Sequence, residues 1–333
     1  MSRPVITARG TGAQRGTQIG EQLAPQLAVA WKRWSAHFNA KDIGAEELAH
    51  RLTDLPAWDA AEKYCPDLLD ELQATAAAAG MPWYQVAGLS MLDESWALTG
   101  GAACTVVAIT RPGSRAAGQN MDLPGWTNGV QTVLNVLDSK ELGVVAATYP
   151  GSLATCGMNS NGVVVVVNAL NLATDLSGLP VDFVTRGALH QPSAKDAVDF
   201  VRSVPHAVGQ SYTILDEHDL FMVEAAADGV IDVPTHALVS SHTNHAFTRE
   251  YEAPADSLIR IAAIDDHRDS LHTAADIVTA LSDRDSGVCT MLGRFKSDLY
   301  SFMGIVGDSL SKEVWVNSDP TGEGQFDKIE WLK

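Results

Sequence analysis

The chain has 333 residues, of which 46% are hydrophobic and 19% charged, and its formal net charge is −18 at pH 7. This length and apolar content can bury a large core, which is typical of a folded globular protein. The acidic balance excludes a nucleic-acid-binding protein, which needs a basic surface, and disfavours binding to acidic lipids. Uninterrupted apolar runs stay below about 18 residues, so no membrane span and no membrane partner are predicted.

The first ten residues lack the apolar core of a signal peptide, so we expect a cytoplasmic protein. The cysteines lie far apart and none forms a Cys-x-x-Cys pair, which predicts neither a zinc ribbon nor a disulfide framework. They are Cys65, Cys104, Cys156 and Cys289. Each is a candidate free thiol.

The first hundred residues are predicted to be mainly helical, because alanine, leucine and charged residues recur there at helical spacing with few β-branched runs. Helices are expected over residues 14–35, 45–52, 67–79 and 83–91. Aromatic side chains such as Trp34 and Phe38 favour a packed segment over a solvated tail. We therefore expect this leader to stay bound to the rest of the protein.

Downstream of residue 103, short β-branched runs indicate strands. These runs cover residues 105–109, 116–122, 130–137, 143–149, 163–167, 211–215 and 220–225. Helical patterns return over residues 181–190, 193–202, 257–265 and 273–281. The all-valine run 163–167 predicts a strand covered on both faces. Blocks of strands and helices indicate an α+β fold, for which a four-layer αββα sandwich fits, with residues 1–103 as leader and 104–333 as catalytic domain.

A small-residue run, Gly100-Gly101-Ala102-Ala103, ends on Cys104 at the start of a strand-like segment. This pattern predicts self-cleavage between Ala103 and Cys104. Cleavage would give Cys104 a free α-amine, and one residue would then carry a thiol nucleophile and its general base. The alternative is a buried cysteine that only fills the core.

The next predicted strand ends at Asp122, and a β-hairpin would bring this carboxylate back toward Cys104. An anion close to the new terminus would hold the α-ammonium of Cys104. The alternative for Asp122 is an acid that caps the following turn.

Taken together, the motifs of this chain resemble the acyl-coenzyme A:6-aminopenicillanic acid acyltransferase family of N-terminal nucleophile hydrolases. The resemblance extends over nearly the whole chain and rests on the order and spacing of short motifs. They are Gly10-Thr-Gly-Ala-Gln-Arg15-Gly16, Cys104-Thr105, Asn120-Met121-Asp122, Gly157-Met-Asn-Ser-Asn-Gly162, Val167-Asn168-Ala169-Leu170 and His242-Thr243-Asn244-His245.

The resemblance implies a precursor that cuts itself into a small helical subunit and a larger subunit headed by Cys104. The product would be a heterodimer of the two fragments, with higher assembly left open, and it would need no cofactor. Members of this family commonly have glycine before the nucleophile, where this chain has Ala103. Alanine reaches positive-φ conformations less freely than glycine, which favours slower cleavage.

Further residues are candidates for the site. Asn244 is predicted to be the oxyanion donor, because a tetrahedral intermediate needs a fixed neutral N–H; the alternative is a loop asparagine that caps local backbone. Candidates for binding or orienting the substrate are Thr105, Asn120, Asn168 and His245. A cation could anchor a substrate carboxylate, and the candidates are Arg294, Lys296 and Arg260.

Two cofactor hypotheses are weaker. His236, His242 and His245 lie within ten residues and could hold zinc, but their spacing matches no metal motif, so no metal is expected. The glycines at the start of the leader are reminiscent of a dinucleotide fingerprint, but Arg15 occupies the third glycine position.

The leading functional hypothesis is a self-processing cysteine amidohydrolase that cleaves a linear C–N amide bond of a small molecule. The first alternative is an acyltransferase that passes an acyl group from a thioester or amide donor to an amine. A non-catalytic, uncut ligand-binding protein is the second alternative, and Ala103 is its main support.

Overall fold

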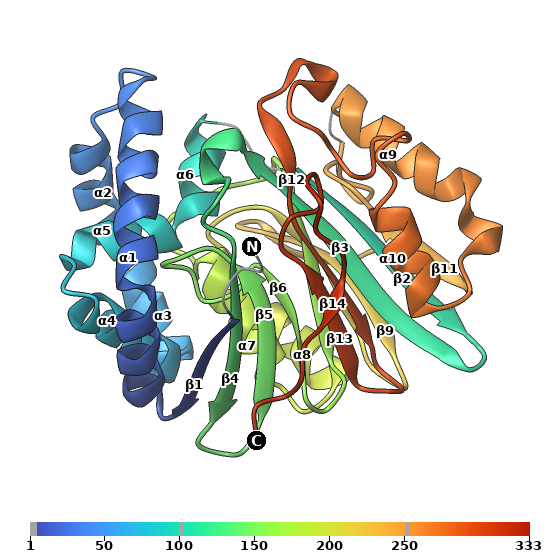
Figure 1. The fold of residues 1–333 in the computed structure, drawn as a ribbon, viewed down its shortest axis with the longest axis horizontal. Coiled ribbons are helices and arrows are strands. Elements are labelled where there is room, and N and C mark those ends of the chain that lie inside the picture. The colour runs from blue at the N-terminus through green and yellow to red at the C-terminus, as the bar shows by residue number, and fades with distance from the viewer. Residues whose placement is uncertain (1–4, 100–102, 251–252) are drawn as a thin grey trace.

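Two β-sheets pack face to face at the centre of the computed structural model, which describes residues 5–99, 103–250 and 253–333 (Figure 1). The first sheet has the strand order β1 (Val5–Gly10), β4 (Thr132–Asp138), β5 (Gly143–Thr148), β6 (Cys156–Asn159), β7 (Val164–Ala169), β8 (Gln210–Leu215), β9 (Leu220–Ala226), β10 (Gly229–Asp232). The second has the order β11 (Val239–His242), β2 (Ala103–Arg111), β3 (Ser114–Pro124), β12 (Leu299–Asp308), β13 (Glu313–Asn317), β14 (Asp327–Lys328).

Helices cover the outer faces of both sheets. Helices α7 (Val181–Leu189) and α8 (Ala194–Ser203) pack on the first sheet, and α9 (Ala255–Asp266) and α10 (Ala274–Leu281) pack on the second (Figure 1). Three short 3₁₀ helices lie in loops, η1 (Gly125–Thr127), η2 (Arg268–Ser270) and η3 (Arg294–Lys296). The predicted four-layer αββα sandwich of the α+β class is confirmed.

The alternation of side chains along β2 divides the core into layers. Cys104, Val106 and Ala108 face the space between the sheets, whereas Val107 and Ile109 pack under α10 with the second sheet's outer core. The four valines of β7 from residue 164 to 167 are buried, as predicted for a strand covered on both faces. Cys104 therefore points its thiol between the two sheets.

The leader forms a helical layer at one edge of the first sheet (Figure 1). Its helices are α1 (Gly12–Asn39), α2 (Ala45–Thr53), α3 (Ala57–Tyr64), α4 (Pro66–Ala78), α5 (Trp83–Ser90) and α6 (Leu92–Thr99). The four predicted helices are present as α1, α2, α4 and α5, while α3, α6 and strand β1 were not predicted. Strand β1 pairs in parallel with β4, so the leader contributes a strand to the same sheet as the downstream segment.

The glycine motif at the start of α1 allows close packing against α4. A Cβ atom at Gly12, Gly16 or Gly20 would lie 1.7, 2.0 or 2.4 Å from a backbone carbonyl oxygen of α4. Only glycine fits at these approaches. Arg15 of the same motif is fully buried, and its Nε donates to Glu71 at 2.5 Å and its Nη2 to Asp67 at 2.8 Å. The motif thus serves packing within the leader.

Candidate active site

Cys104 lies at the start of β2 with 5% of its surface exposed. Its neighbour Ala103 pairs with Asp122 of β3, so the predicted hairpin between Cys104 and Asp122 is formed. The residue before the predicted cleavage point is thus held in the sheet. Residues 100–102, the rest of the small-residue run, lie outside the described residues.

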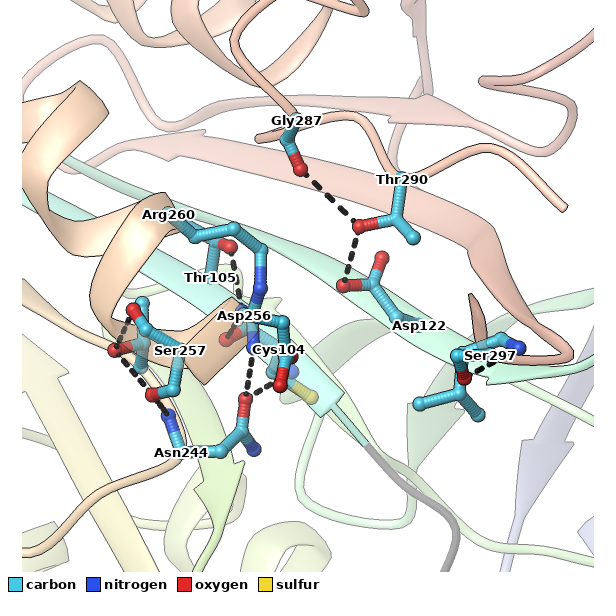
Figure 2. Close-up of polar contacts among 12 residues, drawn as sticks. Cys104, Thr105, Asp122, Asn244, Asp256, Ser257, Arg260, Gly287, Thr290 and Ser297 are labelled. Carbon is cyan, nitrogen blue, oxygen red and sulfur yellow. Dashed lines mark hydrogen bonds and ion pairs between the residues drawn. The ribbon is translucent and has the colours of Figure 1, made fainter. Parts of the chain in front are cut away.

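Three side chains hold the backbone of Cys104, and two of them, Asn244 and Arg260, are seen in Figure 2. Its N–H donates to Asn244 Oδ1 at 2.7 Å. Its carbonyl oxygen accepts from Asn168 Nδ2 at 3.0 Å and from Arg260 Nη1 at 2.5 Å. The nitrogen that cleavage would turn into an α-amine is therefore already positioned in the uncut chain.

Arg260 is the candidate cation that reaches this centre among those whose side chains are described; the side chain of Lys296 lies outside the described part of the structure. It extends from α9, is fully buried, and its Nη2 donates to Asn244 Oδ1 at 2.9 Å and to Asp256 Oδ2 at 3.0 Å. Its Nη1 also donates to Thr105 Oγ1 at 3.0 Å. Thr105 and Asn244 are brought together through this guanidinium (Figure 2).

Asn244 is fixed from both sides. Its Nδ2 donates to Ala169 O at 2.9 Å, and its backbone N–H donates to Ser257 Oγ at 2.8 Å. Ser257 Oγ also lies 2.9 Å from His245 Nδ1. The ring of His245 and the backbone N–H of Asn244 therefore share the same hydroxyl group. The contribution of Ser257 could not be predicted, because a serine inside a helical pattern gives no signal.

Asp122 is fully buried at the end of β3. Its Oδ1 accepts from Ser301 Oγ at 2.6 Å. Its Oδ2 accepts from Thr290 Oγ1 at 3.3 Å (Figure 2). Burial raises the pKa of this carboxyl to about 6, although Arg260 and the two hydroxyls act against the rise. In the uncut chain the nitrogen of Cys104 is thus bonded to Asn244, and Asp122 is held by two hydroxyl groups.

The thiol of Cys104 is protonated in this environment. Burial, together with the negative charges of Asp122 and Asp93, raises its pKa to about 12. A thiolate at working pH therefore requires a base that takes the proton during the reaction.

Two of the predicted residues lie away from the thiol. Asn120 points to the outer face of the second sheet, where its Nδ2 donates to the carbonyl oxygens of Leu281 and Val288 at 2.7 and 3.1 Å. Arg294 donates from Nη2 to the carbonyl oxygen of Asp285 at 2.6 Å, and from Nη1 to that of Arg284. In the uncut chain Asn120 therefore links strand β3 to the end of helix α10, and Arg294 stabilises the loop that contains residues 284 and 285.

A buried glutamate supports the segment that carries Asn244. Glu224 of β9 is fully buried and accepts from His242 Nε2 at 3.2 Å, from Phe247 N at 2.5 Å and from Thr248 N at 3.1 Å. Burial alone would raise the pKa of Glu224, but these hydrogen bonds lower it to about 2. His242 is thus bonded to a carboxylate, and within the described ranges no group of His, Cys, Asp and Glu side chains could hold a metal ion.

The αββα sandwich is the architecture of the N-terminal nucleophile hydrolase fold. The chain belongs to the acyl-coenzyme A:6-aminopenicillanic acid acyl-transferase family, whose sequence model matches residues 110–304, more than half of the chain. The match includes Asp122, Asn168, Asn244 and Arg260 and begins six positions after Cys104.

Similar solved structures include two variants of the conjugated bile acid hydrolase from Clostridium perfringens, a Cys-to-Ala mutant and an Arg-to-Leu variant. Each is 12% identical to this chain, covering 68% of it and 92% of the hydrolase, with TM-scores of 0.46 and 0.44. No curated protein matches the sequence. Among the helices of the described residues, none combines the length and apolar character needed to cross a membrane.

Proposed function

We propose that this protein is a self-processing cysteine amidohydrolase that cleaves a linear amide bond of a small molecule through an acyl-enzyme on Cys104. The observation that carries the proposal is the hydrogen bond from the Cys104 backbone nitrogen to Asn244 Oδ1 at 2.7 Å. The thiol of the same residue faces the space between the sheets. Cleavage at this point would create an amine with an acceptor already in place.

Processing would begin with attack of the Cys104 sulfur on the Ala103 carbonyl carbon. The Ala103–Cys104 C–N bond breaks, the nitrogen takes up the thiol proton, and a thioester joins Ala103 to the sulfur. Water then hydrolyses the thioester, which leaves an Ala103 carboxylate and a free Cys104 α-amine and thiol.

In turnover, the α-amine takes the thiol proton and the sulfur attacks the substrate carbonyl. The resulting ammonium gives its proton to the leaving amine, and water hydrolyses the thioester to release the acid. Asn244 Nδ2 carries two N–H groups, one of which donates to Ala169, so the other is available to an oxyanion. The positive charge of Arg260 next to Asn244 favours the neutral amine that acts as base.

The leader is proposed to remain as the small subunit of a heterodimer after cleavage. Two contacts between the leader and the rest of the chain support this. Strand β1 pairs in parallel with β4, and the carboxylate Oε1 of buried Glu71 lies 3.7 Å from Nη2 of Arg186 in α7. Neither interaction requires an intact Ala103–Cys104 bond.

The first test is the intact mass of the denatured wild type beside Cys104→Ala. Splitting 35.5 kDa by length gives expected fragments of roughly 11 kDa and roughly 24.5 kDa for the wild type, and one full-length chain for Cys104→Ala. Cys156→Ala is the matched control, because Cys156 is also a buried free thiol, and it should process normally. A full-length wild-type chain would contradict self-processing and favour the uncut binding protein.

The second candidate function is acyl transfer, which the family description favours. Both reactions share the acyl-enzyme and differ in whether water or an amine resolves it. Supplying one acyl donor with and without an added amine separates them: acid as the main product supports hydrolysis, and a new amide supports transfer.

A further inference from the structure

Helix α6, the last helix of the leader, places Glu94 at the N-terminal end of α7. Glu94 Oε1 accepts from the backbone N–H of Val181 at 2.9 Å, and Asp182 Oδ2 accepts from Ser90 Oγ at 2.7 Å. Asp93 Oδ1 accepts from Gln210 Nε2 at 3.1 Å. Glu94 and Asp182 are buried, while Asp93 is partly exposed, so Asp93 is the accessible end of this acidic cluster.

Several acceptor atoms around this cluster have no donor. Within the described residues, Gln210 Oε1, Glu94 Oε2 and Asp182 Oδ1 are buried and make no hydrogen bond. Gln210 is 1% exposed, and Oε1 belongs to the same amide group whose Nε2 donates to Asp93. Buried acceptors without donors are costly, and a group that only donates, such as an ammonium, supplies what is missing.

The cluster also lies within electrostatic range of the nucleophile. Asp93 is one of the two carboxylates whose charge raises the pKa of the Cys104 thiol. No arginine or lysine of the described residues forms an ion pair with Asp93, Glu94 or Asp182. Burial raises the pKa of Glu94 well above its usual range and that of Asp182 to about 7, whereas the pKa of Asp93 rises to about 6, so Asp93 is the member of the cluster that is ionised at neutral pH. An ionised carboxylate without a cation points to a positive charge on the incoming molecule.

We propose that Asp93 and Gln210 Oε1 together bind an ammonium group of the substrate, so that the enzyme prefers amides that carry a protonated amine. This inference rests on the proposed amidohydrolase activity. It makes the leader a contributor to specificity, because Asp93 precedes the predicted cleavage point and Gln210 follows it.

The test uses matched pairs of amide substrates. One member of each pair carries a terminal ammonium group, and the other carries a methyl group at the same position. In some pairs this group is on the acyl side of the amide bond, and in others it is on the amine side. For wild type, kcat/KM should favour the ammonium member of at least one pair by about tenfold to hundredfold, as expected for a hydrogen bond to a charged group. Asp93→Asn should remove this preference by lowering only the ammonium member, and Asp93→Glu should retain part of it.

Asp59→Asn is the matched control, because Asp59 is an exposed leader acid on α3, and the preference should be unchanged. Self-cleavage and alkylation of Cys104 by iodoacetamide report whether each variant keeps its site, and the Tm reports whether it folds. Equal wild-type kcat/KM within every pair, or an equal loss for both members in Asp93→Asn, would overturn the inference and leave the proposed function intact. Absence of any Cys104-dependent turnover would overturn both.

Discussion

Two buried arginines organise different regions of this molecule, and their partners differ in charge. In the leader, Arg15 is bonded to two carboxylates, Glu71 and Asp67, and to the neutral carbonyl oxygen of Gly10. At the site, Arg260 is bonded to one carboxylate and to the neutral oxygens of Cys104, Thr105 and Asn244. A buried arginine whose charge is neutralised by carboxylates mainly links secondary structure elements. An arginine whose partners are mostly neutral oxygens exerts a stronger electrostatic effect on the neighbouring atoms. The first arrangement serves stability and the second chemistry.

Removal of the leader arginine should have the largest effect on stability. Arg15→Met leaves Glu71 buried, and among the described residues its remaining ion-pair partner is Arg186, at 3.7 Å. We expect the free energy of unfolding to fall by about 3–5 kcal/mol. Urea unfolding measures this loss. Arg202→Met is the control, because Arg202 pairs with Asp199 and Asp232 at the surface and should cost less than about 1 kcal/mol. Equal losses in the two variants would refute a special role for the buried pair.

Removal of the site arginine should instead affect chemistry. In Arg260→Met, Asn244 and the Cys104 carbonyl lose their common donor, and we expect self-cleavage and kcat/KM to fall about 100- to 1000-fold. The partner left behind, Asp256, is 31% exposed, so the stability loss should be smaller than in Arg15→Met. Processing kinetics and urea unfolding of the same two variants test the comparison. Normal processing in Arg260→Met would contradict it.

The packing of α1 on α4 can be tested with a single methyl group. A Cβ at Gly16 would lie 2.0 Å from the carbonyl oxygen of Glu71, so Gly16→Ala should destabilise the protein by about 1–3 kcal/mol. Gly44→Ala is the control, because its Cβ would meet nothing closer than 3.7 Å. A Tm for Gly16→Ala that matches the control would show that the two helices can separate without cost.

These two regions also differ in how far the sequence predicts them. Helical periodicity indicated α1 and α4, and β-branched runs indicated β2 and β7, because both patterns reflect local burial. Strand β1 was missed, since a six-residue edge strand gives too short a pattern and its partner β4 lies more than 120 positions away. Arg260 could not be singled out among the cations, because only the crossing of α9 over β2 brings it to Cys104. Local patterns predict elements, and long-range contacts assemble the site.

The acids of the two regions should titrate with opposite effects on stability. Burial acts to raise the pKa of Asp67, but Arg15 and the Gly12 N–H lower it below the usual range, so its contribution to stability is lost as pH falls. Burial raises the pKa of Asp122 from 3.8 to about 6, so the folded state favours the protonated form. The stability contributed by protonated Asp122 is complete below about pH 4 and is lost as pH rises through about 6.

Unfolding of the uncut Cys104→Ala protein, with and without Asp122→Asn, isolates the contribution across this range, since both proteins stay single chains and share the other buried acids. The difference in unfolding free energy should change by at most about 1.4 kcal/mol per pH unit between about pH 4 and 6, with the protein that keeps Asp122 losing relative stability as pH rises. Parallel curves for the two proteins would contradict a raised pKa. The ionised form of Asp122, on the destabilised side of this transition, is the form that could hold an ammonium at Cys104.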